Sequence, residues 1–278
     1  MHYYLSDNGI RFNEDFVYVT ETFGVLLDGA TGLFERKINL GNTDAQVFSH
    51  ELGRILCETI ENPSLSLNQI VLNAVEKVKH DFFNDYEDGT DVALPSATIA
   101  CFRIIQEKIE TLCLGDSPLI IKKRNGIDLY EDEILRKNEE KVITFFMKQV
   151  SELQSVTLAK EIIQPNLKEL RQTKNTIDGY AVIDLSGKGL KEAPIYEYGL
   201  DEVEAIIICS DGFYRLVDTF DYLSNSQLFE ELNTYSKALE MLDYLRKVEN
   251  TPDSITVFPR LKVSDDASIG FWCQERMK

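Results

Sequence analysis

Short runs of β-branched and aromatic residues recur along the chain and predict strands. The first two, FVYVTE and FGVLL, cover Phe16–Glu21 and Phe23–Leu27. Later runs of the same kind are Ala97–Ile105, Thr111–Leu114, Pro118–Lys122, Ile127–Tyr130, Tyr180–Asp184, Glu204–Cys209 and Ile269–Trp272. Asn125-Gly126 separates two of these runs, and this dipeptide predicts a hairpin with a type I′ turn.

Between the strand runs, apolar residues take the spacing of helices. Thr43 and Ser66 each open such a segment and are followed three residues later by Gln, which is the spacing of a capping box. Residues 132–171 predict two charged amphipathic helices, and residues 226–248 predict a further helical region. Strands and helices come in blocks rather than in regular alternation, which favours an α+β fold. Because no linker interrupts the pattern, we expect one domain over residues 1–278.

The chain of 278 residues is acidic, with 47 Asp and Glu against 29 Lys and Arg and a formal net charge of −18. Nucleic acids and anionic membranes attract clustered basic residues, so this balance argues against both as partners. No apolar run reaches the ~18 residues that suggest a membrane span. The five cysteines are scattered and lack zinc-site spacing, and the N-terminus lacks a signal-peptide pattern. We therefore expect free thiols in a cytoplasmic protein.

Acidic residues stand where several predicted strands begin or end. Two of them, Asp28 and Asp211, are each followed by Gly, and an Asp-Gly pair on its own is common in turns. A strand can also fix a carboxylate in place while Gly leaves its carbonyl free to bind a cation. Several such positions on separate strands favour a shared cation site over unrelated turns. The positions are Glu14, Asp15, Asp28, Asp211, Asp265 and Asp266.

Six short motifs occur in the order in which one known family has them. They are Gly9–Asp15 (GIRFNED), Phe23–Gly29 (FGVLLDG), Ser96–Thr98 (SAT), Leu114–Ser117 (LGDS), Ile208–Phe213 (ICSDGF) and Asp265–Ile269 (DDASI). They resemble the Arg-x-x-Asn-Glu-Asp, Phe-Gly-Val-x-Asp-Gly, Gly-Ser/Thr-Thr, Gly-Asp-Ser, Ser-Asp-Gly-aromatic and Asp-Asn-x-Thr elements of the metal-dependent protein phosphatases (PPM, the type 2C Ser/Thr phosphatases). The resemblance covers nearly the whole chain.

This resemblance implies a four-layer α-β-β-α sandwich, in which helices flank two antiparallel sheets and two Mg²⁺ or Mn²⁺ ions lie in a cleft at one end. Asp28 would bridge both ions, while Glu14 and Asp15 would act largely through bound water. Asp116 would help to hold a third, weaker ion, and Arg11 would bind the substrate phosphate. The implied metal ligands are Asp28, Gly29, Asp211, Asp265, Glu14, Asp15 and Asp116.

The residue types suit phosphate hydrolysis in their own right. Hard oxygen ligands favour Mg²⁺ or Mn²⁺ over zinc. Two such ions ~3.5–4 Å apart can lower the pKa of a water held between them and present it to phosphorus as hydroxide. An arginine can bind the phosphate through two hydrogen bonds. We therefore expect a monomer that hydrolyses phosphoserine and phosphothreonine in proteins, the substrates of the family, with Arg11, Asp28 and Asp211 as catalytic residues.

Four positions depart from the family pattern, and one of them is Pro95, which precedes Ser96 where the family commonly has glycine. Ala30 stands where many members have a histidine proposed to protonate the leaving group, so the general acid has no assignment. Pro118 replaces an arginine, and Asp266 replaces an asparagine. The extra carboxylate of Asp266 would either raise metal affinity or be solvated.

These departures leave a second function open, an inactive relative that keeps the fold as a regulatory binding module. The retained aspartates argue against it, because carboxylates held together without cations repel one another. Residues 132–171 fall where family members carry a variable flap beside the cleft. We expect them either to control substrate access or to serve as scaffold.

Overall fold

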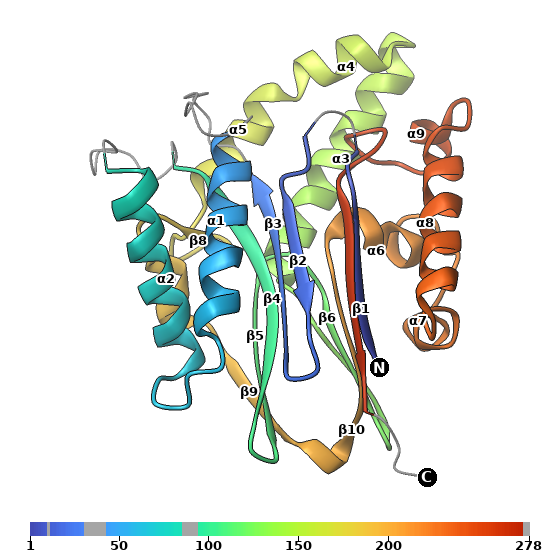
Figure 1. The fold of residues 1–278 in the computed structure, drawn as a ribbon. Helices are drawn as coiled ribbons and strands as arrows, with labels where there is room; N and C mark the ends of the chain where they lie inside the picture. Colours follow the sequence, from blue (N-terminus) through green and yellow to red (C-terminus); the bar gives the residue numbers. More distant parts are fainter. Residues whose placement is uncertain (10–11, 31–42, 85–93, 275–278) are drawn as a thin grey trace.

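The computed structural model describes residues 1–9, 12–30, 43–84 and 94–274, and two antiparallel sheets form its centre (Figure 1). The first, sheet A, has the strand order β1-β11-β10-β6-β7. Leu5 of β1 lies opposite Ile269 of β11, so the beginning and the end of the described chain are hydrogen-bonded neighbours. The strands of sheet A are β1 (His2–Asp7), β6 (Leu119–Lys123), β7 (Gly126–Tyr130), β10 (Val203–Cys209) and β11 (Ala267–Cys273).

The second sheet, sheet B, has the order β2-β3-β4-β5-β9, and β8 pairs with β4 beside this path. All its described pairings are antiparallel. Its strands are β2 (Asp15–Val19), β3 (Phe23–Ala30), β4 (Ser96–Ile105), β5 (Lys108–Leu114), β8 (Ile183–Asp184) and β9 (Ile195–Gly199).

Helices cover the outer face of each sheet and one end of the sandwich (Figure 1). α1 and α2 pack on sheet B, whereas α6, α7 and α8 pack on sheet A. α3, α4 and α5 form a hydrophobic cluster of their own, which also takes in Ile255 of α9. The α-helices are α1 (Asp44–Thr59), α2 (Leu67–Phe82), α3 (Glu133–Leu153), α4 (Val156–Ile162), α5 (Gln164–Gln172), α6 (Asp211–Asp218), α7 (Asn225–Glu231), α8 (Tyr235–Glu249) and α9 (Ser254–Val257), and short 3₁₀ turns cover Lys188–Glu192 and Leu200–Glu202.

The central strand β3 shows why its run of apolar residues is continuous. Leu26 packs between the two sheets against residues such as Trp272, whereas its neighbours Val25 and Leu27 pack against the helices outside sheet B. Successive side chains of a strand point to opposite faces, so a strand covered on both faces needs apolar residues throughout. The two sheets and two helical layers confirm the predicted α+β sandwich.

The predicted helix starts are also confirmed. The hydroxyl of Thr43 accepts a hydrogen bond from the Gln46 amide at 3.0 Å, and that of Ser66 accepts one from the Gln69 amide at 3.3 Å. These bonds satisfy amide groups that would otherwise lack a partner in the first helical turn. None of the described helices is long and apolar enough to cross a membrane.

Some local predictions were wrong. Residues 132–171 form three helices rather than two. The hairpin between β6 and β7 exists, but Lys123 pairs with Gly126, so its central residues are Arg124 and Asn125. Neither has a positive φ, which a type I′ turn requires, whereas Gly126 has φ 152°. The register therefore moves glycine out of the turn centre and into the first position of β7.

Candidate metal centre

Strand pairing brings the acidic ends of β2 and β3 side by side. Asp15 begins β2 and lies opposite Asp28 of β3 in the antiparallel register. Residues that oppose one another project on the same face of a sheet. Asp28 is two residues beyond Leu26, which packs between the sheets, so both carboxylates belong to the face that meets sheet A. The site therefore lies where the space between the sheets opens.

Asp15 is the most deeply buried of these carboxylates. Its side chain is 2% exposed, and neither carboxylate oxygen makes a hydrogen bond at accepted geometry. Burial raises the pKa of Asp15 to about 8, with the nearby hydroxyls of Ser268 and Ser210 lowering it and the charges of Asp266 and Asp211 raising it. A buried polar group without a partner is costly unless a ligand satisfies it. Asp15 is thus suited to a cation or to a water molecule that a cation holds.

Asp28 lies among several like charges. Burial first, and then neighbouring carboxylates, raise its pKa well above the ordinary value. One of these neighbours is Asp211, the first residue of α6. Of the acidic neighbours of Asp28, one comes from sheet B, one from the connection between β5 and β6, and two from segments beside sheet A, so both halves of the sandwich supply carboxylates to one place. The neighbours are Asp15, Asp116, Asp211 and Asp265.

Asp265 is held by cations of the chain itself. Arg215 Nη2 lies 3.0 Å from Asp265 Oδ2, and Lys262 Nζ lies 2.8 Å from Asp265 Oδ1. The same arginine is fixed by the buried Glu249 at 2.8 Å. Burial and Asp265 raise the pKa of Asp211, whereas Arg215 and Lys262 lower it. This side of the site is therefore partly neutralised without a metal.

Asp266 has a role that differs from both expectations. Its Oδ1 accepts a hydrogen bond from the Gly9 amide at 2.8 Å, and its Oδ2 accepts one from the Glu14 amide at 2.7 Å. An asparagine, the usual residue of the family pattern, has one acceptor oxygen and would satisfy one of these amides. Asp266 thus joins the loop before β11 to the N-terminal segment before Asp15 through two hydrogen bonds.

Glu14 and Gly29 are also neighbours. Thr43 Oγ1 donates to Glu14 Oε1 at 2.5 Å, which orients that carboxylate. The Gly29 amide donates to the Glu14 carbonyl at 3.2 Å. A Cβ atom at position 29 would lie 2.7 Å from this carbonyl oxygen, so the close approach of the two backbones requires glycine.

A cleft of about 580 Å³ opens between α3, α6 and the loop before β11, and it is lined by Asp116, Asp211 and Asp265. Glu139 of α3 also lines it and faces Asp116, because its charge is second only to burial in raising the pKa of that aspartate. Burial and the charge of Asp211 raise the pKa of Glu139 itself to about 7. Sequence reasoning missed Glu139, since a glutamate within a charged helix carries no local signal.

The donor set fits a divalent cation, although its members are not gathered around one point. Among the described residues, no three His, Cys, Asp or Glu side chains form a group that could hold a metal ion as they stand. The buried Asp15 without hydrogen bonds and the raised pKa of Asp28 are what a cation would relieve. Carboxylate and carbonyl oxygens suit Mg²⁺ or Mn²⁺.

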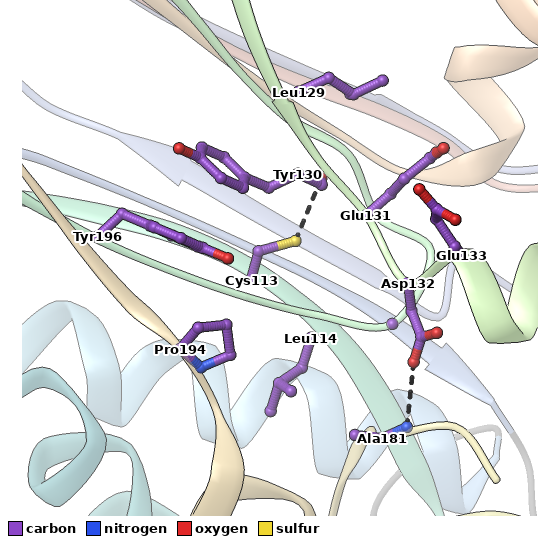
Figure 2. Close-up of a pocket in the computed structure, with 11 residues that line it drawn as sticks. Cys113, Leu114, Leu129, Tyr130, Glu131, Asp132, Glu133, Ala181, Pro194 and Tyr196 are labelled. Atoms are coloured by element: carbon purple, nitrogen blue, oxygen red, sulfur yellow. Dashed lines mark hydrogen bonds between the residues drawn. The ribbon is translucent and has the colours of Figure 1, made fainter. Parts of the chain in front are cut away.

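A second pocket, of about 350 Å³, lies beside this cleft (Figure 2). The rings of Tyr130 and Tyr196 stack in it at 4.0 Å between centroids. Asp132 Oδ2 accepts a hydrogen bond from the Ala181 amide at 3.2 Å on another side of the pocket. Glu131 lines both this pocket and the cleft, so the two adjoin there. Figure 2 includes none of the predicted metal ligands.

Two catalytic roles, binding of the substrate phosphate and protonation of the leaving group, have no residue among those that the structure describes. Arg11, the predicted phosphate ligand, lies outside the described residues, and Ala30 lacks a proton to give. Of the histidines, His50 contacts the site through its Nε2, 2.9 Å from the Asp15 carbonyl oxygen. Its ring is bound to backbone at the start of β2 and supports that strand.

Comparison with known proteins gives a match in structure. No protein-family sequence model and no curated protein matches the chain. Serine/threonine phosphatase Stp1 from Staphylococcus aureus is similar with a TM-score of 0.56 and 12% identity, over 99% of this chain and 94% of that chain. The catalytic domain of serine/threonine phosphatase PstP in complex with two manganese ions gives 0.53 and 17%, over 98% and 96%.

A third similar structure is the PPM Ser-Thr phosphatase MsPP from Mycobacterium smegmatis in complex with cacodylate. It gives a TM-score of 0.52 and 14% identity, over 98% of this chain and 97% of that chain. At such identities the likeness concerns the arrangement of the backbone. The chain therefore has the fold of the PPM-type serine/threonine phosphatases.

Proposed function

We propose that the chain is a protein phosphatase that requires Mg²⁺ or Mn²⁺ and hydrolyses phosphoserine and phosphothreonine. The observation that carries this proposal is a group of aspartates at one end of the sandwich, in which Asp15 pairs with Asp28 across β2 and β3 and the charges of four aspartates raise the pKa of Asp28. The shared fold supports it, as does the two-manganese complex of the similar PstP domain. The aspartates are Asp15, Asp28, Asp116, Asp211 and Asp265.

When bound, two divalent cations would activate a water molecule for attack on phosphorus and neutralise charge on the phosphoryl oxygens. Asp28 is the proposed ligand of both ions, because the other four aspartates surround it. The Gly29 carbonyl would bind one ion, and Asp211 and Asp265 would bind the other. Asp116 would help to hold a third, weaker ion.

Other residues of the chain would orient these ligands and the substrate. Glu14 and Asp15 would bind water in the ion shells, and the bond from Thr43 holds Glu14 in place for this role. Arg11 would bind the substrate phosphate through its planar guanidinium group. α3 lines the cleft, which supports a role for residues 132–171 in substrate access.

Hydrolysis of p-nitrophenyl phosphate and of phosphopeptides tests the proposal. We expect activity with millimolar Mn²⁺, loss of activity in EDTA and recovery when Mn²⁺ is restored. Phosphoserine and phosphothreonine peptides should be hydrolysed in preference to a phosphotyrosine peptide of the same sequence. Activity that persists unchanged in EDTA would contradict metal dependence.

One observation favours a second candidate, a regulatory binding module without catalysis. Asp265 is engaged by Arg215 and Lys262, so part of the site is balanced in the absence of metal. A module of this kind would bind phosphoproteins without hydrolysing them. Absence of turnover by the folded protein in millimolar Mn²⁺ would favour this candidate over the phosphatase.

The proposal includes a setting as well as a reaction. All five cysteines are free, which supports a reducing compartment such as the cytoplasm. A phosphoprotein is the proposed partner, acted on by a monomer. The net charge of −18 argues against nucleic acid and anionic membranes as partners.

A further inference from the structure

Two cations of the chain contact the proposed metal ligand Asp265, and one of them is a lysine. Lys262 Nζ lies 2.8 Å from Asp265 Oδ1, and the side chain of Lys262 is 62% exposed. We infer that Lys262 is the counter-ion of the metal-free centre and that it leaves Asp265 when a divalent cation binds there. This inference rests on the proposed function, because it takes Asp265 as a metal ligand.

The two cations on Asp265 differ in how firmly they are held. Arg215 is 8% exposed in its side chain, and its Nη1 lies 2.8 Å from the carboxylate of Glu249, which is fully buried. Removing a buried charge from its partners is strongly unfavourable, so this arginine stays in place. Its bond to Asp265 Oδ2 leaves Oδ1 as the oxygen that can change partner.

Lys262, in contrast, can move at low cost. The Asp265 side chain is only 18% exposed, but the lysine end of the pair lies in water, so a released ammonium group is solvated and its side chain gains rotational freedom. The residue lines the cleft, so a released ammonium group enters solvent directly. Exchange of the lysine for a metal ion at Oδ1 therefore requires no change in the core.

Competition between the two cations follows from charge as well as from space. The Lys262 ammonium group is bonded to Asp265 and is also attracted by the charges of Asp211 and Asp28. It therefore partly neutralises the carboxylates that a metal ion would bind. Part of the attraction that draws a divalent cation into the cleft is then already satisfied. The lysine lowers the affinity of the centre for metal while stabilising the metal-free fold.

Calorimetric titration of the full chain with Mn²⁺ tests this inference. We expect Lys262→Met to bind Mn²⁺ about tenfold more tightly than the original protein, and Lys262→Arg to bind about as the original does. Lys108→Met is a matched control, because Lys108 pairs with Glu197 at 3.0 Å and its side chain is 66% exposed. It should leave the affinity for Mn²⁺ unchanged.

Thermal unfolding supplies a second readout that does not depend on activity. In EDTA, Lys262→Met should unfold at a lower temperature than the original, and saturating Mn²⁺ should raise its Tm by more. Lys262→Gln serves if the Met variant does not fold. Equal or weaker Mn²⁺ affinity in both neutral variants overturns the inference. In that case the proposed metal centre still stands if the original protein binds Mn²⁺ and Asp28→Asn abolishes the binding. If neither the original protein nor the variants bind Mn²⁺, the proposed metal centre and the role of Lys262 are both wrong.

Discussion

Sheet B and the segments beside sheet A place carboxylates at the same end of the sandwich, but they balance the charge in different ways. On sheet B, Asp15 is buried without a hydrogen bond, and Asp28 faces other carboxylates. Beside sheet A, Asp265 is bound by Arg215 on one oxygen and by Lys262 on the other. Among the described residues, no Arg or Lys forms an ion pair with Asp15 or Asp28, whereas Asp265 has two such partners.

A metal centre must bind cations strongly and must also be stable when the cations are absent, and these two requirements conflict. Carboxylates without counter-charges bind cations strongly but repel one another when the cations are absent. Carboxylates paired with Arg and Lys keep the fold stable but bind cations less strongly. The chain divides these tasks between its two sheets. Substitutions on either side should therefore affect activity and stability in different proportions.

The largest effect is expected on the uncompensated side, from Asp28→Asn. Loss of the central carboxylate should lower Mn²⁺-dependent kcat by about 10³-fold or more. The metal-free protein should become more stable, because one of several repelling charges is gone. Phosphatase assays and thermal unfolding in EDTA measure the two changes. Asp243→Asn, on the exposed face of α8, is the control, and retained activity in Asp28→Asn would exclude this residue from the centre.

On the compensated side, Arg215→Met should mainly reduce stability. It leaves the buried Glu249 without one of its cations, and breaking a buried pair costs about 3–5 kcal/mol. Urea unfolding measures the change. Arg54→Met is the control, since Arg54 is 50% exposed and pairs with carboxylates on its own helix, where the cost is about 0–1 kcal/mol. Equal costs for both variants would contradict the distinction.

The stability of the metal-free protein should depend on pH through the uncompensated side. The pKa of Asp15 is about 8 in the folded state against 3.8 for an ordinary aspartate. Between these values the folded protein keeps a proton that the unfolded chain has lost, so stability is present below about pH 4 and falls as the pH rises toward 8.

At its steepest, this decrease is about 1.4 kcal/mol per pH unit for one such group. Urea unfolding in EDTA at several pH values between 5 and 8 measures it. Asp15→Asn should reduce the slope, and saturating Mn²⁺ should abolish it by favouring the ionised carboxylates. A free energy of unfolding that stays constant over this range would show that Asp15 is ionised in the folded protein.

The smallest effect should come from Asp266, which joins the two sides. Asp266→Asn loses one of two hydrogen bonds to backbone amides and should cost about 1–1.5 kcal/mol in unfolding free energy. Asp266→Ala loses both and should cost about twice as much. Hydrogen exchange of the Gly9 and Glu14 amides should be faster in both variants. Slower exchange of these amides would contradict their hydrogen bonds to Asp266.

The parts of the fold that were predictable share one property, a local pattern. FGVLL in β3 is buried on both faces and reads as a strand without further context. β1 and β9 each lie at an edge of a sheet and escaped prediction because half-exposed polar residues interrupt their apolar pattern, whereas the opposite edge strands, β2 and β7, were predicted. Edge strands take their identity from a neighbour that is distant in sequence.

The same distinction holds at the site. Asp28 and Asp211 could be selected because each ends an apolar run and precedes glycine. Glu139, Arg215 and Lys262 could not, because a charged residue in a helix or a loop has no local feature that reveals its partner. Their roles come from the packing of α3 and α6 against the loop before β11. Sequence motifs selected the carboxylates of the candidate centre, whereas the cations that pair with them could be found only in the structure.

The position of β11 between β1 and β10 has a consequence for biosynthesis. Sheet A cannot close until its latest strand is made, because β11 connects the earliest strand to the rest of the sheet. Asp265 and Asp266 directly precede this strand, so they reach the cleft at the same time. A nascent chain on the ribosome therefore carries Asp28 for most of its synthesis before Lys262, Asp265 and Asp266 are made. A chain that stops before Asp265 should therefore lack the proposed activity.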